Sequence, residues 1–351
     1  MGKSFAVIDV GSEETFALAV RWIKNGGYLV EGFHRARSSG MSDGSVTEVY
    51  PASDHIRSLL AGLSKKTGIS FHDVYAGISS PSVQVFPSTG SILISRYGRE
   101  VSFRDIKKCV EIGSLARIPL DREVLHRIVM GFSVDGERLI RDPEGLEAVK
   151  LGVEVNIATI NVTFVRNFSK SIAQAGYIPS GFVLSPLASS TRILSEDDKL
   201  DRTVFILTHG KKTEVLFLNS GNLENCVVFD EPIAKKHFSS GVEEEGDEFG
   251  MFFKVVSSMR GWQDMRRIVV SGTRTVPEEF LQYVEKASGM PVRVGLPLTK
   301  PFEDLPEDGA SYAAALGVLD QLGNSKSKKK GETNSFKRAV YKVMGTLDEY
   351  F

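Results

Sequence analysis

A strand and turn at the start of the chain constrain the fold more than any other feature. Residues 5–8 are four consecutive apolar residues, and residues 9–12 continue as Asp-Val-Gly-Ser. A short apolar run that ends in a turn is typical of a buried strand, and glycine in a turn can adopt backbone angles that other residues resist. The amides of such a turn can bind phosphate when a second turn faces them. Asp9, Gly11 and Ser12 are therefore candidate cofactor-binding residues.

The length and composition favour a chain with two or more lobes. Its 351 residues are 42% hydrophobic and 25% charged, and this length exceeds one compact unit. The net charge of −1 argues against a dedicated nucleic-acid-binding protein. Cys109 and Cys226 lack metal-ligand spacing, so we predict reduced core thiols in a reducing compartment and no metal site. We expect neither a signal peptide nor a membrane-spanning helix, because no apolar run approaches about 18 residues.

Alternating strand and helix patterns predict α/β lobes with mixed sheets. The first set has strands at 5–8, 15–22, 28–33 and 73–78 and a helix that buries Ile56, Leu59, Leu60 and Leu63. The second set has strands at 203–207, 214–218, 268–270 and 292–294 and helices at 277–288 and 311–322. A second phosphate turn would lie at residues 209–212, between the first two strands of the second set.

The middle of the chain, residues 83–160, has the pattern of a separate module. Its helix is predicted over 102–117 and begins at Ser102, which can cap the first turn. The side chains expected to face inward from this helix are Ile106, Val110 and Leu115. No cluster of catalytic residue types falls in the module, so we expect it to serve in packing or in docking a partner.

The last sixteen residues have the pattern of an amphipathic helix that binds a membrane surface. Apolar residues recur at helical spacing after a polar linker at 323–335. Seven lysine and arginine residues between Lys326 and Lys342 would meet anionic lipid, at about 1 kcal/mol for each basic residue near the surface. The predicted membrane-binding residues are Phe336, Lys337, Arg338, Val340, Val343, Met344, Leu347, Tyr350 and Phe351. The alternative is a terminal helix that packs on the protein itself or on a partner.

Several segments, taken together in order and spacing, resemble FtsA, the bacterial actin-like protein that tethers the division ring to the membrane. They are residues 9–12 (DVGS), 74–79 (VYAGIS), 99–101 (REV), 124–126 (VLH), 142–146 (DPEGL), 187–190 (LASS), 291–297 (PVRVGLP) and 311–317 (SYAAALG). The resemblance runs almost end to end. It implies an α/β fold of the two-lobed actin-like/Hsp70-type ATPase superfold, with an inserted SHS2-type subdomain and a C-terminal amphipathic helix.

The resemblance also implies the domain boundaries. The first actin-like lobe would cover 1–82 and 163–195, and the SHS2-type subdomain, which carries filament and partner contacts in the family, 83–162. The second lobe would cover 196–322, followed by a flexible linker at 323–335 and the membrane-targeting helix at 336–351. The outer subdomain at about 230–262 is shorter than in the family, where it docks the tubulin-like FtsZ, and this weakens the expectation of direct FtsZ binding.

The second phosphate turn departs from the family pattern. The family has Asp-Ile-Gly-Gly-Gly-Thr-x-Asp, whose aspartate serves the Mg²⁺ side and whose glycine amides approach the phosphates, whereas residues 207–214 are Leu-Thr-His-Gly-Lys-Lys-Thr-Glu. The adenosine-side loop at 271–275 is Ser-Gly-Thr-Arg-Thr in place of a glycine run. By resemblance, Gly210, Lys211 and Gly272 complete the candidate cofactor-binding residues.

These departures predict a relic of a nucleotide site. The alternative is residual ATP binding, in which Lys211 and Lys212 supply positive charge in place of glycine amides. ATP and Mg²⁺ are implied by the family resemblance alone, we predict no catalytic residue, and we do not expect ATP hydrolysis.

The sequence therefore predicts an FtsA-like peripheral membrane scaffold on the cytoplasmic face of the cell membrane. Its expected partners are membrane lipids, cell-division proteins, and either a second copy or another FtsA. Two alternatives stay open: a type IV pilus assembly protein similar to PilM, and an active actin-like ATPase. Deletion of residues 336–351 would separate the first alternative from the scaffold, and isothermal titration with Mg-ATP would separate the second.

Overall fold

The computed structural model describes residues 3–11, 14–23, 27–42, 45–209, 212–230, 247–272, 276–299, 302, 305 and 310–326. Its contacts divide the chain into two compact units, which are described separately. We call the first unit the body; it comprises Met1–Ile23, Tyr28–Val83 and Thr163–Gln321. The second unit comprises Gln84–Val162, which we call the insert, with Lys24–Gly27 and Leu322–Phe351.

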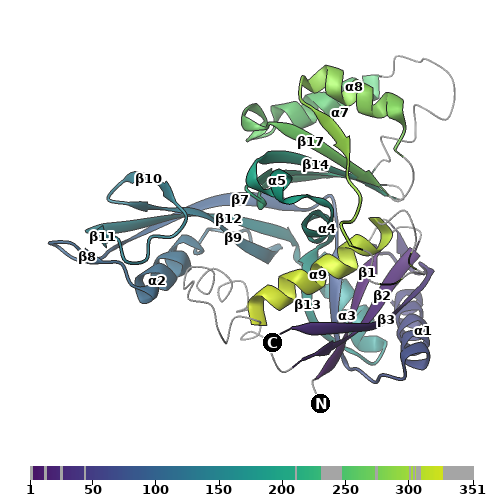
Figure 1. The fold of residues 1–351 in the computed structure, drawn as a ribbon. Coiled ribbons are helices and arrows are strands. Elements are labelled where there is room, and N and C mark those ends of the chain that lie inside the picture. Colours follow the sequence, from purple (N-terminus) through teal and green to yellow (C-terminus); the bar gives the residue numbers. More distant parts are fainter. Residues whose placement is uncertain are drawn as a thin grey trace. The chain divides into compact units, whose positions relative to one another are not determined.

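The first sheet of the body has five strands in the order β13-β6-β1-β2-β3 (Figure 1). They are β1 (Ser4–Val10), β2 (Glu14–Trp22), β3 (Tyr28–Arg37), β6 (Asp73–Ile78) and β13 (Ile178–Leu184). β1, β2 and β3 form an antiparallel meander; β6 pairs with β1 in parallel, and β13 pairs with β6 in parallel. Residues 5–8 are at most 1% exposed, which confirms the buried strand predicted at the start of the chain.

The second sheet of the body repeats this arrangement, in the order β16-β15-β14-β17-β18. Its strands are β14 (Arg202–His209), β15 (Lys212–Asn219), β16 (Asn222–Phe229), β17 (Arg267–Gly272) and β18 (Val292–Val294). β14, β15 and β16 form the meander; β17 pairs with β14 in parallel, and β18 pairs with β17 in parallel. The turn between β14 and β15 is therefore the topological counterpart of the turn between β1 and β2.

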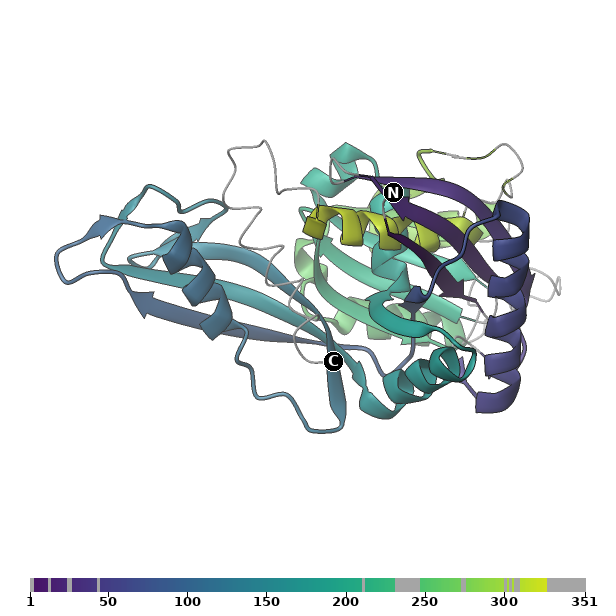
Figure 2. The same cartoon turned by 90° about the horizontal axis from the view of Figure 1, so that it is seen from below.

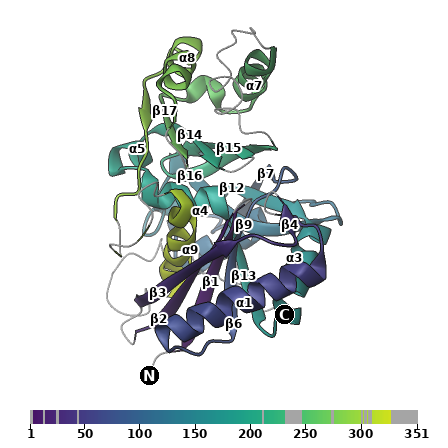
Figure 3. The ribbon, with the colours of Figure 1, turned by 90° about the vertical axis from the view of Figure 1, so that its right-hand side faces the viewer.

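Helices at corresponding places cover the two sheets. α1 (Val49–Thr67) contacts β2 and β3 through the predicted face of Ile56, Leu59, Leu60 and Leu63 and ends at Gly68, whose φ is 70°. α3 (Val162–Gln174) leads into β13. On the second sheet, α7 (Asp247–Ser258) and α8 (Glu278–Ser288) bury Phe252, Val256, Phe280 and Val284 against the strands (Figure 3). The helical segments in the described part of residues 230–262 are α7 and the first residue of the short helix η1 (Trp262–Asp264).

Two helices cross closely within the body. α4 (Ser185–Ile193) follows β13, and α9 (Ala310–Lys326) packs against it. A Cβ at Gly317 of α9 would lie 1.9 Å from the carbonyl oxygen of Ala188 in α4, so only glycine fits at this crossing. Arg192 of α4 forms an ion pair with Asp320 of α9, with Nε 2.6 Å from Oδ2. Tyr28 also donates a hydrogen bond to Asp320 at 3.0 Å, so the crossing is fixed by packing and by charge.

The remaining body elements are short. They are the ribbon of β4 (Met41–Ser42) and β5 (Ser45–Val46), and α5 (Glu196–Leu200), which begins with a capping box between Ser195 and Asp198. In the part of the chain that the structure describes, no helix is long and apolar enough to cross a membrane.

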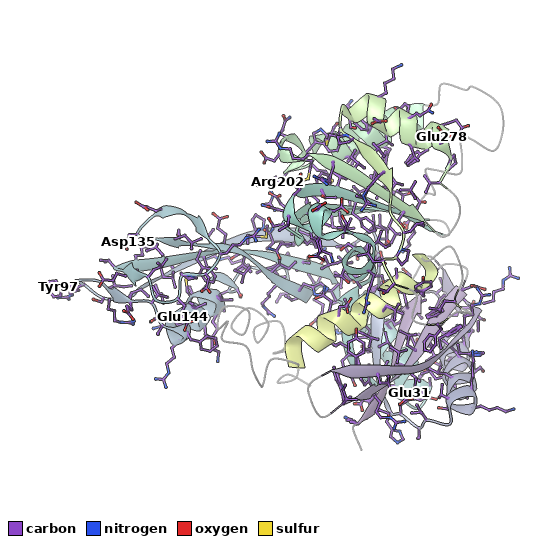
Figure 4. The ribbon with its side chains drawn as sticks, viewed as in Figure 1. Glu31, Tyr97, Asp135, Glu144, Arg202 and Glu278 are labelled. Carbon is purple, nitrogen blue, oxygen red and sulfur yellow. The ribbon has the colours of Figure 1, made fainter. Side chains whose placement is uncertain are left out.

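The insert contains a four-stranded sheet in the order β10-β9-β12-β7, a two-stranded ribbon and one helix. The strands are β7 (Gln84–Leu93), β8 (Arg99–Glu100), β9 (Arg122–Val134), β10 (Glu137–Ile140), β11 (Glu147–Ala148) and β12 (Lys150–Asn161). The helix α2 (Phe103–Gly113) packs on β7 and β12 (Figure 2). It buries Ile106, Cys109 and Val110. Tyr97, Asp135 and Glu144 lie toward one end of the insert (Figure 4).

The predicted start of α2 is confirmed, but its predicted end is wrong. Ser102 and Asp105 form a capping box, as the sequence pattern indicated. The helix ends at Gly113, where the chain approaches β7 so closely that a Cβ at Gly90 would lie 2.4 Å from the Gly113 nitrogen. Leu115 therefore lies beyond the helix and is 80% exposed, instead of facing inward.

Candidate functional site at the turns after β1 and β14

The first turn follows β1, and its glycine is required by a close approach. The Gly11 amide donates to the Glu14 carbonyl at 3.0 Å, and a Cβ at Gly11 would lie 2.7 Å from the same oxygen. Gly11 does not adopt the left-handed backbone conformation that the sequence argument assumed. The predicted reason for glycine is therefore wrong: glycine is required here by steric contact across the turn and not by its backbone angles. Ser12 lies outside the described residues.

A partly buried relay of hydrogen bonds supports this turn. The hydroxyl of Ser38 donates to the Gly11 carbonyl at 3.0 Å and lies 3.0 Å from the hydroxyl of Thr15. The Nε2 atom of His55 in α1 lies 2.9 Å from the same Thr15 hydroxyl. Burial lowers the pKa of His55, which favours the neutral ring. The relay connects α1, β2 and the segment after β3 to the turn, and the sequence pattern gave no sign of it.

Asp9 lies where the carboxyl ends of the parallel strands meet. The Ser185 hydroxyl, at the first residue of α4, donates to Asp9 Oδ1 at 2.6 Å. Gly77 of β6 leaves the room for this contact, because a Cβ there would lie 2.5 Å from Asp9 Oδ1 and 2.7 Å from Ser185 Oγ. Ligands of α/β proteins bind at such strand ends. The structure thus places Asp9 and Gly11 at an edge that suits a ligand, with the Asp9 carboxylate held by α4.

Two buried charged residues follow the second turn. Gly210 and Lys211 lie outside the described residues, but Lys212 and Glu214 on β15 are 1% and 0% exposed. The Lys212 ammonium donates to the backbone carbonyl of Ser79 at 3.2 Å, and the Ser79 hydroxyl donates to the Glu214 carboxylate. Ser79 is the first residue after β6 of the first sheet. Both contacts therefore join the second sheet to the first at the edge where the candidate turns lie.

This contact assigns Lys212 a partner that the sequence argument did not foresee. In the residual-ATP alternative, Lys212 offers its charge to phosphate, whereas in the structure its ammonium is buried against the protein's own backbone. The signal available in the sequence was the i, i+2 spacing of Lys212 and Glu214, which puts both side chains on one face of a strand. Nothing local indicated that Ser79 would face them.

The third candidate position, Gly272, ends β17 and pairs with Thr208 of β14. It is buried within the second sheet, and the following residues 273–275 lie outside the described chain. Among the described residues, no group of three or more histidine, cysteine, aspartate or glutamate side chains converges in a way that could hold a metal ion. The predicted membrane-binding residues, Phe336 to Phe351, also lie outside the described residues.

Comparison with known proteins identifies the insert and the fold. The family model for the SHS2 domain inserted in FtsA matches residues 81–159. The cell division protein FtsA of Streptococcus pneumoniae is 29% identical over 216 residues, which cover 61% of this chain and 47% of that protein. FtsA of Pseudomonas aeruginosa is 25% identical over 233 residues, which cover 66% and 55%. The chain thus spans about half the length of these curated relatives.

A solved structure extends the fold comparison to most of the chain. The PilM–PilN type IV pilus biogenesis complex superimposes with a TM-score of 0.58 and 14% identity, covering 90% of this chain and 97% of that chain. At this identity the likeness concerns the fold alone. It agrees with the duplicated sheets of the body, each a three-stranded meander extended by two parallel strands. The chain is an FtsA-like protein, with an SHS2 domain inserted into a two-lobed actin-like fold.

Proposed function

We propose that this chain is a peripheral membrane scaffold of the FtsA type, which tethers cell-division proteins to the cytoplasmic face of the cell membrane without depending on nucleotide. Two observations support the proposal. The sequence relatives are cell division proteins, and the tail of the chain has the residue pattern of an interfacial helix. The observation that carries the nucleotide-independent part is the burial of Lys212 and Glu214 against Ser79 at the candidate site.

Two contributions to the binding free energy, apolar insertion and electrostatic attraction, support membrane attachment by residues 336–351 and the linker before them. In a helical projection, the apolar face contains Phe336, Val340, Val343 and Leu347, which would enter the headgroup boundary. The lysines and arginines between Lys326 and Lys342 add attraction to anionic lipid. Gly345 costs an isolated helix about 1 kcal/mol, so we expect the helix to form on contact with lipid.

Co-sedimentation of the full chain with vesicles tests attachment. We expect binding to vesicles that contain phosphatidylglycerol, weaker binding to phosphatidylcholine alone, and weaker binding in high salt, because salt screens the charges. Leu347→Glu places a charge on the apolar face and should abolish sedimentation. Tyr341→Glu makes the same charge change on the polar side of the projection, between Asp348 and Gly345, and should retain most of it. Equal sedimentation of the wild type and L347E would contradict the proposal.

The proposed partners are cell-division proteins, including a second copy of the chain or another FtsA. Direct binding of FtsZ is not the favoured contact, because the interval at about 230–262 is shorter than the subdomain with which FtsA docks FtsZ. A PilM-like role has the support of the fold alone at 14% identity, whereas the sequence relatives favour division. Loss of membrane attachment on deletion of residues 336–351 would further favour the division scaffold.

A further inference from the structure

We propose that Lys212, Glu214 and Ser79 form an internal latch that joins the two sheets of the body beside the turns after β1 and β14. The inference rests on the proposed nucleotide independence and names the device behind it. The three residues come from the two topologically equivalent halves of the body: Ser79 follows β6 of the first sheet, and the other two lie on β15 of the second.

In the latch, Lys212 and Glu214 both form hydrogen bonds with the same residue, Ser79. Lys212 and Glu214 are two positions apart on β15, so their side chains leave the strand on the same side. The ammonium binds the Ser79 carbonyl at 3.2 Å, and the carboxylate accepts the Ser79 hydroxyl. One contact uses the backbone and the other the side chain of the same residue. Sliding or opening of one sheet relative to the other would break both contacts together.

Because all three residues are buried, losing either contact would cost free energy. Lys212 is 1% exposed, Glu214 is 0% exposed, and Ser79 is 6% exposed. A charged group that has left water must keep its hydrogen-bond partners, since no solvent replaces them. Opening the joint would therefore leave buried polar groups to be rehydrated, and the closed state is favoured.

The latch lies beside the turns that would contact phosphate. Lys212 is the first residue of β15, directly after the β14–β15 turn, and Ser79 follows β6, whose Gly77 flanks Asp9. In the latch, the ammonium group of Lys212 links the two sheets at this edge, so no bound ligand is needed to link them. The consequence is a body that is closed in the absence of nucleotide and that gains no further closure when Mg-ATP is added.

Hydrogen–deuterium exchange of the full chain tests the latch, read at residues 79–83 and in β14 and β15. We expect Lys212→Met and Glu214→Gln each to raise exchange at least tenfold on both sides of the joint, with no recovery in Mg-ATP. Ser79→Ala removes the hydroxyl and keeps the carbonyl, so its effect should be smaller. The double variant Lys212→Met/Glu214→Gln leaves no unpaired buried charge, and it should open the joint no further than the more severe single variant.

Arg202→Met is the matched control, because Arg202 pairs with Glu224 and Asp264 within the second sheet and its neighbouring segment. It should leave exchange at residues 79–83 unchanged. Unchanged exchange at residues 79–83 in all latch variants, or strictly additive effects in the double variant, would overturn the latch. If a single variant does not fold, S79A and the double variant decide. Increased protection of the wild type in Mg-ATP would instead overturn the proposed nucleotide independence and leave the latch contacts as a separate result.

Discussion

The crossing of α4 and α9 allows a prediction with a calculable magnitude, the replacement Gly317→Ala. The new Cβ would lie 1.9 Å from the carbonyl oxygen, 2.4 Å from the carbonyl carbon and 2.9 Å from the Cα of Ala188. Favourable contacts between such atoms need about 3.5–4.0 Å, so the helices must separate by more than 1 Å, as an order of magnitude. The obstructing atoms are backbone, and α4 is held at both ends by the Ser185–Asp9 and Arg192–Asp320 contacts.

The expected free-energy change is a difference of two terms. Overpacking of a tight site costs about 1–3 kcal/mol, and alanine in place of glycine in a helix returns about 1 kcal/mol. Because backbone must move, we expect the upper end of the cost, with a net loss of about 1–2 kcal/mol. For a unit of this size, about 1 kcal/mol lowers Tm by about 2–4 °C.

Scanning calorimetry of the full chain measures this effect, and Gly62→Ala in α1 is the matched control. A Cβ at Gly62 would meet the ring of His34, 2.7 Å from Nε2, and a side chain can rotate away where backbone cannot. The control should be neutral or slightly more stable than the wild type. The reasoning about the crossing is refuted if Gly317→Ala melts at or above the wild-type temperature.

Two further predictions concern buried titrating groups. Burial lowers the pKa of His126 in the insert to about 4, below the usual value of 6.5, so the unfolded chain binds the proton more readily and stability falls as pH drops from about 6.5 to about 4. The free energy of unfolding should fall by about 3 kcal/mol over this range, measured by amide exchange of β9 and β12. His126→Gln should remove most of this pH dependence. A wild-type free energy of unfolding that does not change with pH would refute the buried neutral ring. Burial raises the pKa of Asp198, but hydrogen bonds from Arg293 and Ser195 outweigh it and the pKa lies below its usual value, so stability is present above about pH 4 and lost below it. Arg293→Met should lower the free energy of unfolding by about 1–3 kcal/mol, measured by urea unfolding near pH 7, because Arg267 still lies 3.5 Å from Asp198. The difference in this free energy between variant and wild type should shrink below about pH 4. A difference that does not change with pH would contradict the role of the ion pair.

Local patterns predicted most of the strands and helices because the two halves of the body repeat simple apolar periodicities. The buried strand at residues 5–8, the face of α1 and the Ser102–Asp105 capping box all follow from residues close in sequence. The end of α2 was mispredicted because it depends on Gly90, more than twenty residues earlier in the chain, which brings β7 against Gly113.

The sequence allowed the residues of the first turn to be placed, but not the contacts made beside the second turn. Asp9 and Gly11 belong to one strand and turn, so the sequence alone indicated their place. The partner of Lys212 and Glu214 is Ser79, more than 130 residues away, and no spacing rule connects residues on different sheets. The Ser38–Thr15–His55 relay was not predicted either, because its members are 23 and 40 residues from Thr15 in the sequence and come from three different segments. The membrane-binding role of residues 336–351 stays a prediction.

The most direct test of the scaffold compares what the chain captures at membranes with and without a functional tail. Wild type, L347E and Y341E carrying the same affinity tag would be expressed at equal levels, fractionated into membrane and soluble pools, and the captured proteins quantified by mass spectrometry. The scaffold predicts that wild type and Y341E sediment with membranes together with cell-division proteins, and that L347E leaves the membrane pool while it still captures them. Recovery of the wild-type chain in the soluble pool, or equal membrane recovery of L347E, would contradict the account.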